Sequence, residues 1–158
     1  MQKYCIKCKK IMNYKIFDNN IYNYITGSSH VILKNETFAV LHDYCHVELY
    51  DNSNIQLGDN SHVLLYHNSF AELNENTYAI LHDYSKILLF DNSFAKLFDN
   101  SFVILYNNSS AKLYDNSSAK LFDESSAKLF HNSFANLYKN SSAELWNDSS
   151  APEYSGQC

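Results

Sequence analysis

The stretch SSAKLYDNSSAKLFDESSAKLFHNSF (109–134) repeats one eight-residue unit three times with few changes. The same unit runs without insertion from Ser29 to Asp148, and a degraded sixteenth copy begins at Ser149. Repetition over about three quarters of a chain points to a repeat architecture before any local motif is considered. The question is whether the repeat carries chemistry or only architecture.

Within each unit, the first, third and fifth positions are small or apolar. Position one is Ser or Thr in fifteen of sixteen units, with Cys45 as the exception, and position five is Leu in all fifteen complete units. Position three is always Ala, Val or Ile. Such alternation has a period of two, which is typical of a β-strand with one buried face.

The seventh and eighth positions interrupt the strand. Asp fills the seventh position in eight of fifteen units, and Asn fills the eighth in ten. Both side chains hydrogen-bond to nearby backbone, and Asn tolerates the left-handed conformation, so the pair forms a corner without glycine. We expect these Asp residues to form turns rather than to bind calcium, because the chain lacks Gly-rich calcium loops.

Position-by-position identity favours parallel stacking. In a parallel solenoid each residue lies about 4.8 Å from its equivalent in the next coil, so identical residues form ladders. Antiparallel hairpins would need no such match. The sequence therefore predicts an all-β fold, a parallel β-solenoid (β-helix) built from eight-residue repeats.

The number of octads in one coil stays open between two and three. With two, Ser faces Leu and Ala faces Ala across the core, a sensible match of sizes. With three, small Ala leaves a void, yet one face becomes wholly charged at Glu48, Glu72, Lys96, Lys120 and Glu144. A 40-residue echo between 37–52 and 77–92 spans five octads and fits neither number. We favour two octads per coil.

Departures from the repeat suggest three parts. Residues 1–28 break the register and form an N-terminal cap or a small unit containing Cys5-x-x-Cys8, and residues 29–148 form the solenoid. Residues 149–158 form a C-terminal cap or tail, in which Pro152 and Glu153 replace strand and core residues. Solenoids need such caps because their end strands are unpaired.

The composition disfavours several classes of partner. The chain has 12 Lys but no Arg, and its formal net charge is −5. Arg is the preferred reader of phosphates and guanine edges, so direct binding to nucleic acid is not expected. No apolar run approaches the ~18 residues of a membrane span, and residues 1–12 lack the apolar region expected of a signal peptide. We expect a cytoplasmic protein whose four Cys form no disulfide framework.

The repeat resembles two known kinds of solenoid. Units such as SAKLYDNS (110–117) are similar to the octapeptide-repeat β-solenoids of bacterial and phage proteins. The Ala-x-Leu core pair beside Asp and Asn more distantly resembles pentapeptide-repeat proteins, although the period here is eight. Some pentapeptide-repeat proteins imitate a DNA duplex and block enzymes that bind DNA, which suggests a function here only by analogy.

Cys5 and Cys8 form the sharpest local motif. A Cys-x-x-Cys pair is half of a zinc site, and four ligands are normally needed. His30, His42 or His46 could supply the rest, two chains could share one metal, or the pair could be ordinary thiols. No cofactor is expected apart from this zinc alternative.

The sixth position is the candidate binding surface because it is aromatic in most units. If these rings point outward, they form stacked ladders and an apolar patch suited to a protein partner or to self-association. The alternative is that they fold over the core as packing ladders. The candidate residues are Tyr50, Tyr66, Phe90, Phe98, Tyr106, Tyr114, Phe122, Phe130, Tyr138 and Trp146.

Catalysis is not expected. The chain has no recognisable nucleophile arrangement and no Gly loop for phosphate, and its repeats carry no long loops on which an active site could be built. We expect a non-catalytic protein-binding or self-assembling solenoid. The alternative is an inhibitor from a phage or mobile element that mimics nucleic acid and blocks a host enzyme. Acidity and the lack of Arg favour the alternative, while lysines such as Lys96, Lys112 and Lys128 weigh against it.

Overall fold

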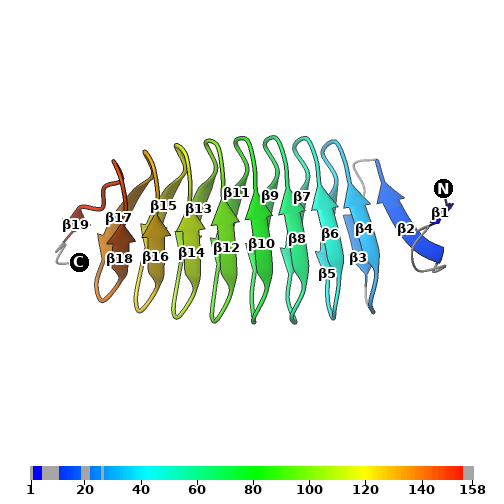
Figure 1. Ribbon diagram of the computed structural model, residues 1–158. Helices are drawn as coiled ribbons and strands as arrows, with labels where there is room; N and C mark the ends of the chain where they lie inside the picture. Colours follow the sequence, from blue (N-terminus) through cyan, green and yellow to red (C-terminus); the bar gives the residue numbers. More distant parts are fainter. Residues whose placement is uncertain (1, 5–10, 19–21, 26, 155–158) are drawn as a thin grey trace.

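A computed structural model of the chain describes residues 2–4, 11–18, 22–25 and 27–154. Within these ranges the protein consists of β-strands and turns arranged as a stack of narrow coils (Figure 1). The chain alternates between two sheets, so that odd and even octads lie on opposite sides of a thin core.

The ten-stranded sheet follows the order β1-β2-β4-β6-β8-β10-β12-β14-β16-β18. Its strands are β1 (Gln2–Tyr4), β2 (Ile11–Phe17), β4 (His30–Leu33), β6 (His46–Leu49), β8 (His62–Leu65), β10 (Tyr78–Leu81), β12 (Phe94–Leu97), β14 (Ser110–Leu113), β16 (Ser126–Leu129) and β18 (Ser142–Leu145).

The nine-stranded sheet follows the order β19-β17-β15-β13-β11-β9-β7-β5-β3. Its strands are β3 (Tyr22–Ile25), β5 (Phe38–Leu41), β7 (Asn54–Leu57), β9 (Phe70–Leu73), β11 (Lys86–Leu89), β13 (Phe102–Leu105), β15 (Ser118–Leu121), β17 (Phe134–Tyr138) and β19 (Glu153–Tyr154).

Two octads complete one coil. Strand β12 pairs in parallel with β10 and β14, so Ala95 lies between Ala79 and Ala111, each sixteen residues away. The predicted parallel β-solenoid with two octads per coil is confirmed, and the three-octad alternative is wrong. The wholly charged face that three octads would form does not exist, since Glu48 and Lys96 belong to the ten-stranded sheet and Glu72 to the nine-stranded sheet.

The core is a sheet-on-sheet layer of identical ladders. The third and fifth residues of almost every octad are fully buried, as for Ala95 and Leu97. The first residue is buried too, although it is polar. In many octads its hydroxyl is satisfied across the turn, as when Ser53 Oγ donates to the Tyr50 carbonyl oxygen at 2.8 Å. The hydroxyls of Ser69, Ser125 and Ser133 are buried without a hydrogen-bond partner among the described residues. Small Ser and Ala facing Leu and Ala keep the layer close-packed.

Each corner depends on one left-handed residue at the seventh position. Every seventh residue from Asn35 to Asn147 has a positive φ, and Asn60 and Asn76 at the eighth position share it. In most corners the first residue of the next octad donates its N–H across the turn, as from Ser93 to the Phe90 carbonyl. Asp and Asn are frequent here because they tolerate this conformation better than other residues with a Cβ.

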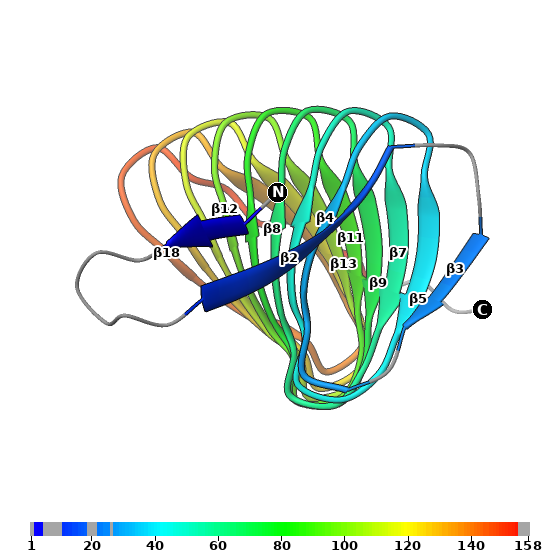
Figure 2. The same ribbon diagram turned by 90° about the vertical axis from the view of Figure 1, so that its right-hand side faces the viewer.

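The two ends of the solenoid differ. At the N-terminal end β2 and β3 stack in parallel on β4 and β5, and β1 pairs with β2 in antiparallel fashion (Figure 2). At the C-terminal end β18 is the last described strand of its sheet, and Leu145 is 48% exposed there. The apolar layer is thus covered at one end and partly open at the other.

Candidate binding surface

The sixth residues of alternate octads form two ladders, one at each corner of the coil. We call the corner that follows the strands of the ten-stranded sheet the first corner, and the other the second corner. The first corner carries the complete ring ladder, Tyr50, Tyr66, His82, Phe98, Tyr114, Phe130 and Trp146. The second corner carries the interrupted ring ladder, in which Phe90, Tyr106, Phe122 and Tyr138 stack.

Neighbouring rings of the complete ladder are parallel and evenly spaced. Ring centroids lie 5.1 Å apart for Tyr50 and Tyr66 and 4.9 Å apart for Phe130 and Trp146. The angle between neighbouring ring planes lies between 6° and 13°. The strand spacing sets this arrangement, because each ring is carried by the next coil at about 4.8 Å. Parallel rings at such distances attract one another beyond their burial.

The rings are half-buried, so they pack against one another while one part stays open to solvent. Trp146 is the most open at 40% exposed. The structure brings all ten candidate residues into the two ladders, six on the first corner and four on the second. His82 stacks between Tyr66 and Phe98 in the first ladder. It is absent from the candidates because these were restricted to Phe, Tyr and Trp. That these ladders bind a partner stays a prediction.

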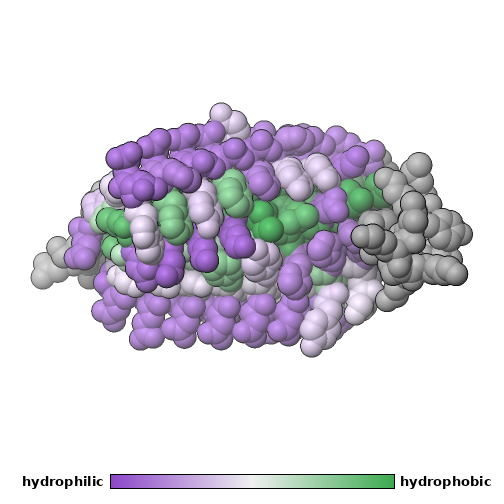
Figure 3. All heavy atoms as spheres, viewed as in Figure 1, coloured by the Kyte–Doolittle hydropathy of each residue, from purple (hydrophilic) through white to green (hydrophobic). Residues whose placement is uncertain are grey.

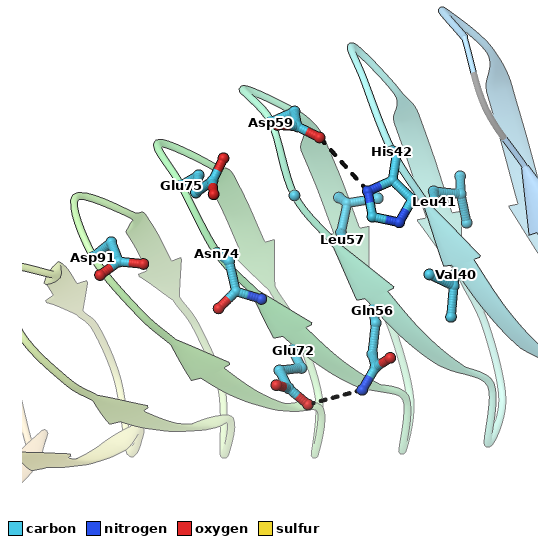
Figure 4. A pocket seen from close by; sticks show the side chains of 11 residues that line it. Val40, Leu41, His42, Gln56, Leu57, Asp59, Glu72, Asn74, Glu75 and Asp91 are labelled. Carbon is cyan, nitrogen blue, oxygen red and sulfur yellow. Dashed lines mark hydrogen bonds and ion pairs between the residues drawn. The ribbon is translucent and has the colours of Figure 1, made fainter.

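The interrupted ladder lacks rings at Gly58 and Asn74, and a depression of about 530 Å³ lies there (Figure 4). Its apolar floor includes Leu41 and Leu57. Carboxylates surround it, and the lining acids are Asp59, Glu72, Glu75 and Asp91. Two contacts join lining residues: Gln56 Nε2 donates to Glu72 Oε2 at 3.2 Å, and His42 Nδ1 lies 3.7 Å from Asp59 Oδ2.

A third ring ladder lies on the outer face of the ten-stranded sheet at the second position of the octad. His30, His46, His62, Tyr78 and Phe94 follow one another from β4 to β12, with centroids 4.7 to 6.3 Å apart. Figure 3 shows apolar residues along the middle of this face, between polar corners. The sequence contains a signal for this ladder, namely a ring or imidazole at every sixteenth residue. That spacing has a structural meaning only when two octads form one coil.

Burial and neighbouring charges shift the pKa values of His46 and Tyr50, which lie near the N-terminal end of this face. Desolvation and the neighbouring His30 and His62 lower the pKa of His46 from its ordinary value of 6.5, against the opposing effect of Glu48. Burial and the hydrogen bond to Glu48 raise the pKa of Tyr50 to about 12. Glu48 therefore joins the two ladders: Tyr50 Oη donates to Glu48 Oε2 at 2.9 Å, and His30 Nε2 lies 3.3 Å from Glu48 Oε1.

The seventh-position aspartates, which we call the Asp rows, hold the corners of adjacent coils together. They are Asp43, Asp51, Asp59, Asp83, Asp91, Asp99, Asp115 and Asp123. Asp83 Oδ2 accepts the backbone N–H of His67 at 3.0 Å, and Asp99 Oδ2 accepts that of Asp83 at 3.2 Å. These contacts give the carboxylates a structural role at the turns. A melting temperature that is independent of calcium remains the expectation.

The zinc hypothesis falls outside the described residues, because Cys5 and Cys8 both lie in 5–10. In the part of the chain that the structure describes, no group of three or more His, Cys, Asp or Glu side chains is placed to hold a metal ion. Cys45 is buried in place of a core Ser, and desolvation raises the pKa of its thiol. Its Sγ lies 3.2 Å from the His42 carbonyl oxygen, so it replaces Ser in the turn as well.

Comparisons with protein-family models, with curated proteins and with solved structures find no match for this chain. Among the described residues there is no helix with the length and apolar character needed to cross a membrane. The function must therefore be argued from the surface itself.

Proposed function

We propose that the protein is a non-catalytic binding scaffold that presents its ring ladders to a protein partner or to another copy of itself. The observation that carries this proposal is that the coil does not need the rings. At Gly58 and Asn74 the sixth position has no ring, and the coil continues: Asp59 and Glu75 keep the left-handed φ of 57° and 55°, although the next residues, Asn60 and Asn76, are left-handed there as well.

Rings that the fold can spare, yet that recur on every coil of the first corner from Tyr50 to Trp146, suit a contact surface. Aromatic residues are enriched at the centres of protein interfaces, where they supply large area with few rotatable bonds. Here the stacking already fixes each ring, so little side-chain freedom remains to be lost on binding. The complete ladder is the principal contact of the proposal, and the interrupted ladder is secondary.

The proposal is tested by affinity capture from a bacterial lysate at low and high salt, with mass spectrometry of the retained proteins. A partner held by the rings stays bound at high salt and is lost with the double variant Tyr114→Ser/Phe130→Ser. The matched control is Tyr106→Ser/Phe122→Ser, which removes two stacked rings from the second corner. Circular dichroism confirms that each variant folds. Retention that is unchanged in the first-corner variant contradicts the proposal.

A second candidate is an inhibitor that mimics nucleic acid, and the Asp rows favour it. Half-exposed carboxylates such as Asp51 and Asp99 recur along the rod at the coil spacing. Cations interrupt these rows, since Lys139 Nζ lies 3.0 Å from Asp123 Oδ1. In the same capture experiment, a nucleic-acid enzyme that salt releases and that ring removal leaves bound would support mimicry instead.

A further inference from the structure

The outer face of the nine-stranded sheet has a pattern that is complementary to itself when reversed. Fourth-position residues form one row across this face, in register from strand to strand. From β5 to the residue before β19 the row reads Val40, Gln56, Glu72, Leu88, Ile104, Lys120, Asn136 and Pro152. Its two apolar central members, Leu88 and Ile104, are half-buried, and Lys120 is exposed.

Reversal of this row about the midpoint between Leu88 and Ile104 matches each residue with a suitable partner. Leu88 meets Ile104, Glu72 meets Lys120, and Gln56 meets Asn136. A two-fold axis that runs parallel to the strands, between β11 and β13, produces this reversal in a face-to-face dimer. Every pair then occurs twice, so one dimer contains two Glu72–Lys120 pairs.

The second-position residues of the same face form another row, and the same two-fold axis pairs residues of complementary size in it. Reversal places a large side chain against a smaller one or a ring against a cation. Phe70 meets Ser118, Phe134 meets Asn54, and Lys86 meets Phe102. Interfaces pack well when bulky residues enter spaces left by small ones, and a Lys over a Phe ring is attractive.

Other registers and the other sheet fail this test. An axis shifted by one coil places an apolar residue of this row opposite a charged one: Ile104 meets Lys120 when the axis moves in one direction, and Leu88 meets Glu72 when it moves in the other. On the ten-stranded sheet the best axis, between β8 and β10, matches Glu48 with Lys96 but sets Ile32 against Lys112. It also brings rings against rings at the second position, as for His46 and Phe94.

The acidic depression is a second, independent observation that favours the dimer, because its carboxylates would attract a cationic side chain of another copy. Gln56 and Glu72 of the fourth-position row form part of its lining, and Asp59, Glu75 and Asp91 project from the adjacent turns (Figure 4). No lysine lines this depression among the described residues. Lys120 makes no ion pair with a described residue of its own chain, so it is free to enter the depression of a second copy.

We propose that the protein forms a face-to-face homodimer through the outer face of the nine-stranded sheet, with Lys120 of each copy in the acidic depression of the other. This inference goes beyond the proposed function, because it concerns a sheet face rather than the ring ladders and does not depend on them. Seven strands about 4.8 Å apart, with four residues of about 3.3 Å each, give a face of roughly 400 Å² per copy. The two copies together then bury roughly 800 Å², which is less than most stable interfaces bury and suits a weak, transient one, so we expect a dissociation constant in the micromolar range.

Sedimentation velocity of the full chain from about 5 to 500 μM, a range that brackets the expected micromolar constant, tests the dimer. Lys120→Glu and Glu72→Lys should each weaken dimerisation roughly 100-fold, because like charges then oppose each other twice in the interface. The double variant Glu72→Lys/Lys120→Glu should restore it by exchanging the charges. The matched control is Lys112→Glu, in an octad with the same SSAKL sequence on the opposite sheet, which should dimerise as the wild type does.

Each outcome decides the question. Wild-type protein that stays monomeric over the whole range contradicts the dimer, as does a Lys112→Glu variant that is weakened as much as Lys120→Glu. Failure of the double variant to recover, with an unchanged melting temperature, contradicts the Glu72–Lys120 pairing. Capture of a different protein through Tyr114 and Phe130 is measured separately, so the proposed ladder function can fail or succeed independently of this face.

Discussion

The two corners of the coil share one backbone and differ in what they carry. At the first corner, seven rings stack without a gap from Tyr50 to Trp146. At the second, Gly58 and Asn74 break the series, and a depression lined by carboxylates takes the place of two rings. The left-handed seventh residue is present at every turn of both corners from Asn35 to Asn147.

This difference separates what the fold requires from what it only permits. The left-handed seventh residue and the buried third and fifth residues recur at both corners, so they specify the coil. Sixth-position residues vary from Gly58 to Trp146 while the coil continues. Where Gly58 and Asn74 stand in place of rings, the eighth residues Asn60 and Asn76 are left-handed as well, so the turn differs locally but the coil is kept. The rings are therefore available for other roles. Substitutions matched between the two corners test this distinction.

The largest expected effect concerns the Leu residues beneath the two corners. Leu65→Ala, under the complete ladder, should lower the free energy of unfolding by about 3 kcal/mol, because it leaves a cavity in a fully buried layer. Leu57→Ala should cost nearer 2 kcal/mol, because Leu57 lines the open depression and its loss leaves less enclosed space. Urea denaturation of both variants measures the difference. Equal losses in the free energy of unfolding would mean that the open depression does not reduce the cost of the cavity.

A smaller effect is expected for the rings themselves. Tyr114→Ser breaks two stacking contacts, at 5.0 Å with Phe98 and 4.9 Å with Phe130, and should cost about 1–2 kcal/mol. Asn74→Tyr adds a ring next to Phe90 and should gain about 0.5–1 kcal/mol while it fills the depression. Thermal unfolding followed by circular dichroism reports both. A neutral Tyr114→Ser would show that the stack adds nothing to stability.

The His ladder should make stability depend on pH. The pKa of His46 is lowered in the folded protein, so folding disfavours its protonated form. The resulting stability is complete above pH 6.5 and is lost as the pH falls through the lowered pKa. Denaturation between pH 5 and 8 should therefore show a decline on the acid side. His46→Phe, which continues the rings of Tyr78 and Phe94, should reduce that decline, and an unchanged pH profile would exclude His46 as its source.

The smallest effect is expected at corners where the left-handed residue is neither Asp nor Asn. His131 has a φ of 58°, and its imidazole lies 3.7 Å from Asp115 in an exposed pair that is worth little. His131→Asn should raise the free energy of unfolding by about 0.5–1 kcal/mol, because Asn adopts this conformation at lower cost. Chemical denaturation measures the gain. A loss of stability would indicate that the His131–Asp115 contact matters more than the backbone.

The sequence was sufficient to predict the strands, the buried positions and the parallel stacking, because each depends on a period that recurs in every octad. It left the number of octads per coil open, since the apparent charged face at Glu72 and Lys120 favoured three. The sixth position held the deciding signal: with two octads per coil, Tyr50, Tyr66 and their successors form an unbroken series of rings. The depression at Gly58 and Asn74 could not be predicted, because it arises where two rings of the ladder are missing and no motif marks it.

The alternation of octads between two sheets restricts how a gene for this rod can change. Duplication of sixteen residues lengthens the rod and leaves every downstream residue on its original side, whereas duplication of eight exchanges the two sides. The echo between 37–52 and 77–92 is offset by five octads, an odd number. Its first copy accordingly begins on the nine-stranded sheet with β5 and its second on the ten-stranded sheet with β10. Related segments have thus been placed on opposite sides of one molecule, where they are free to diverge toward different contacts.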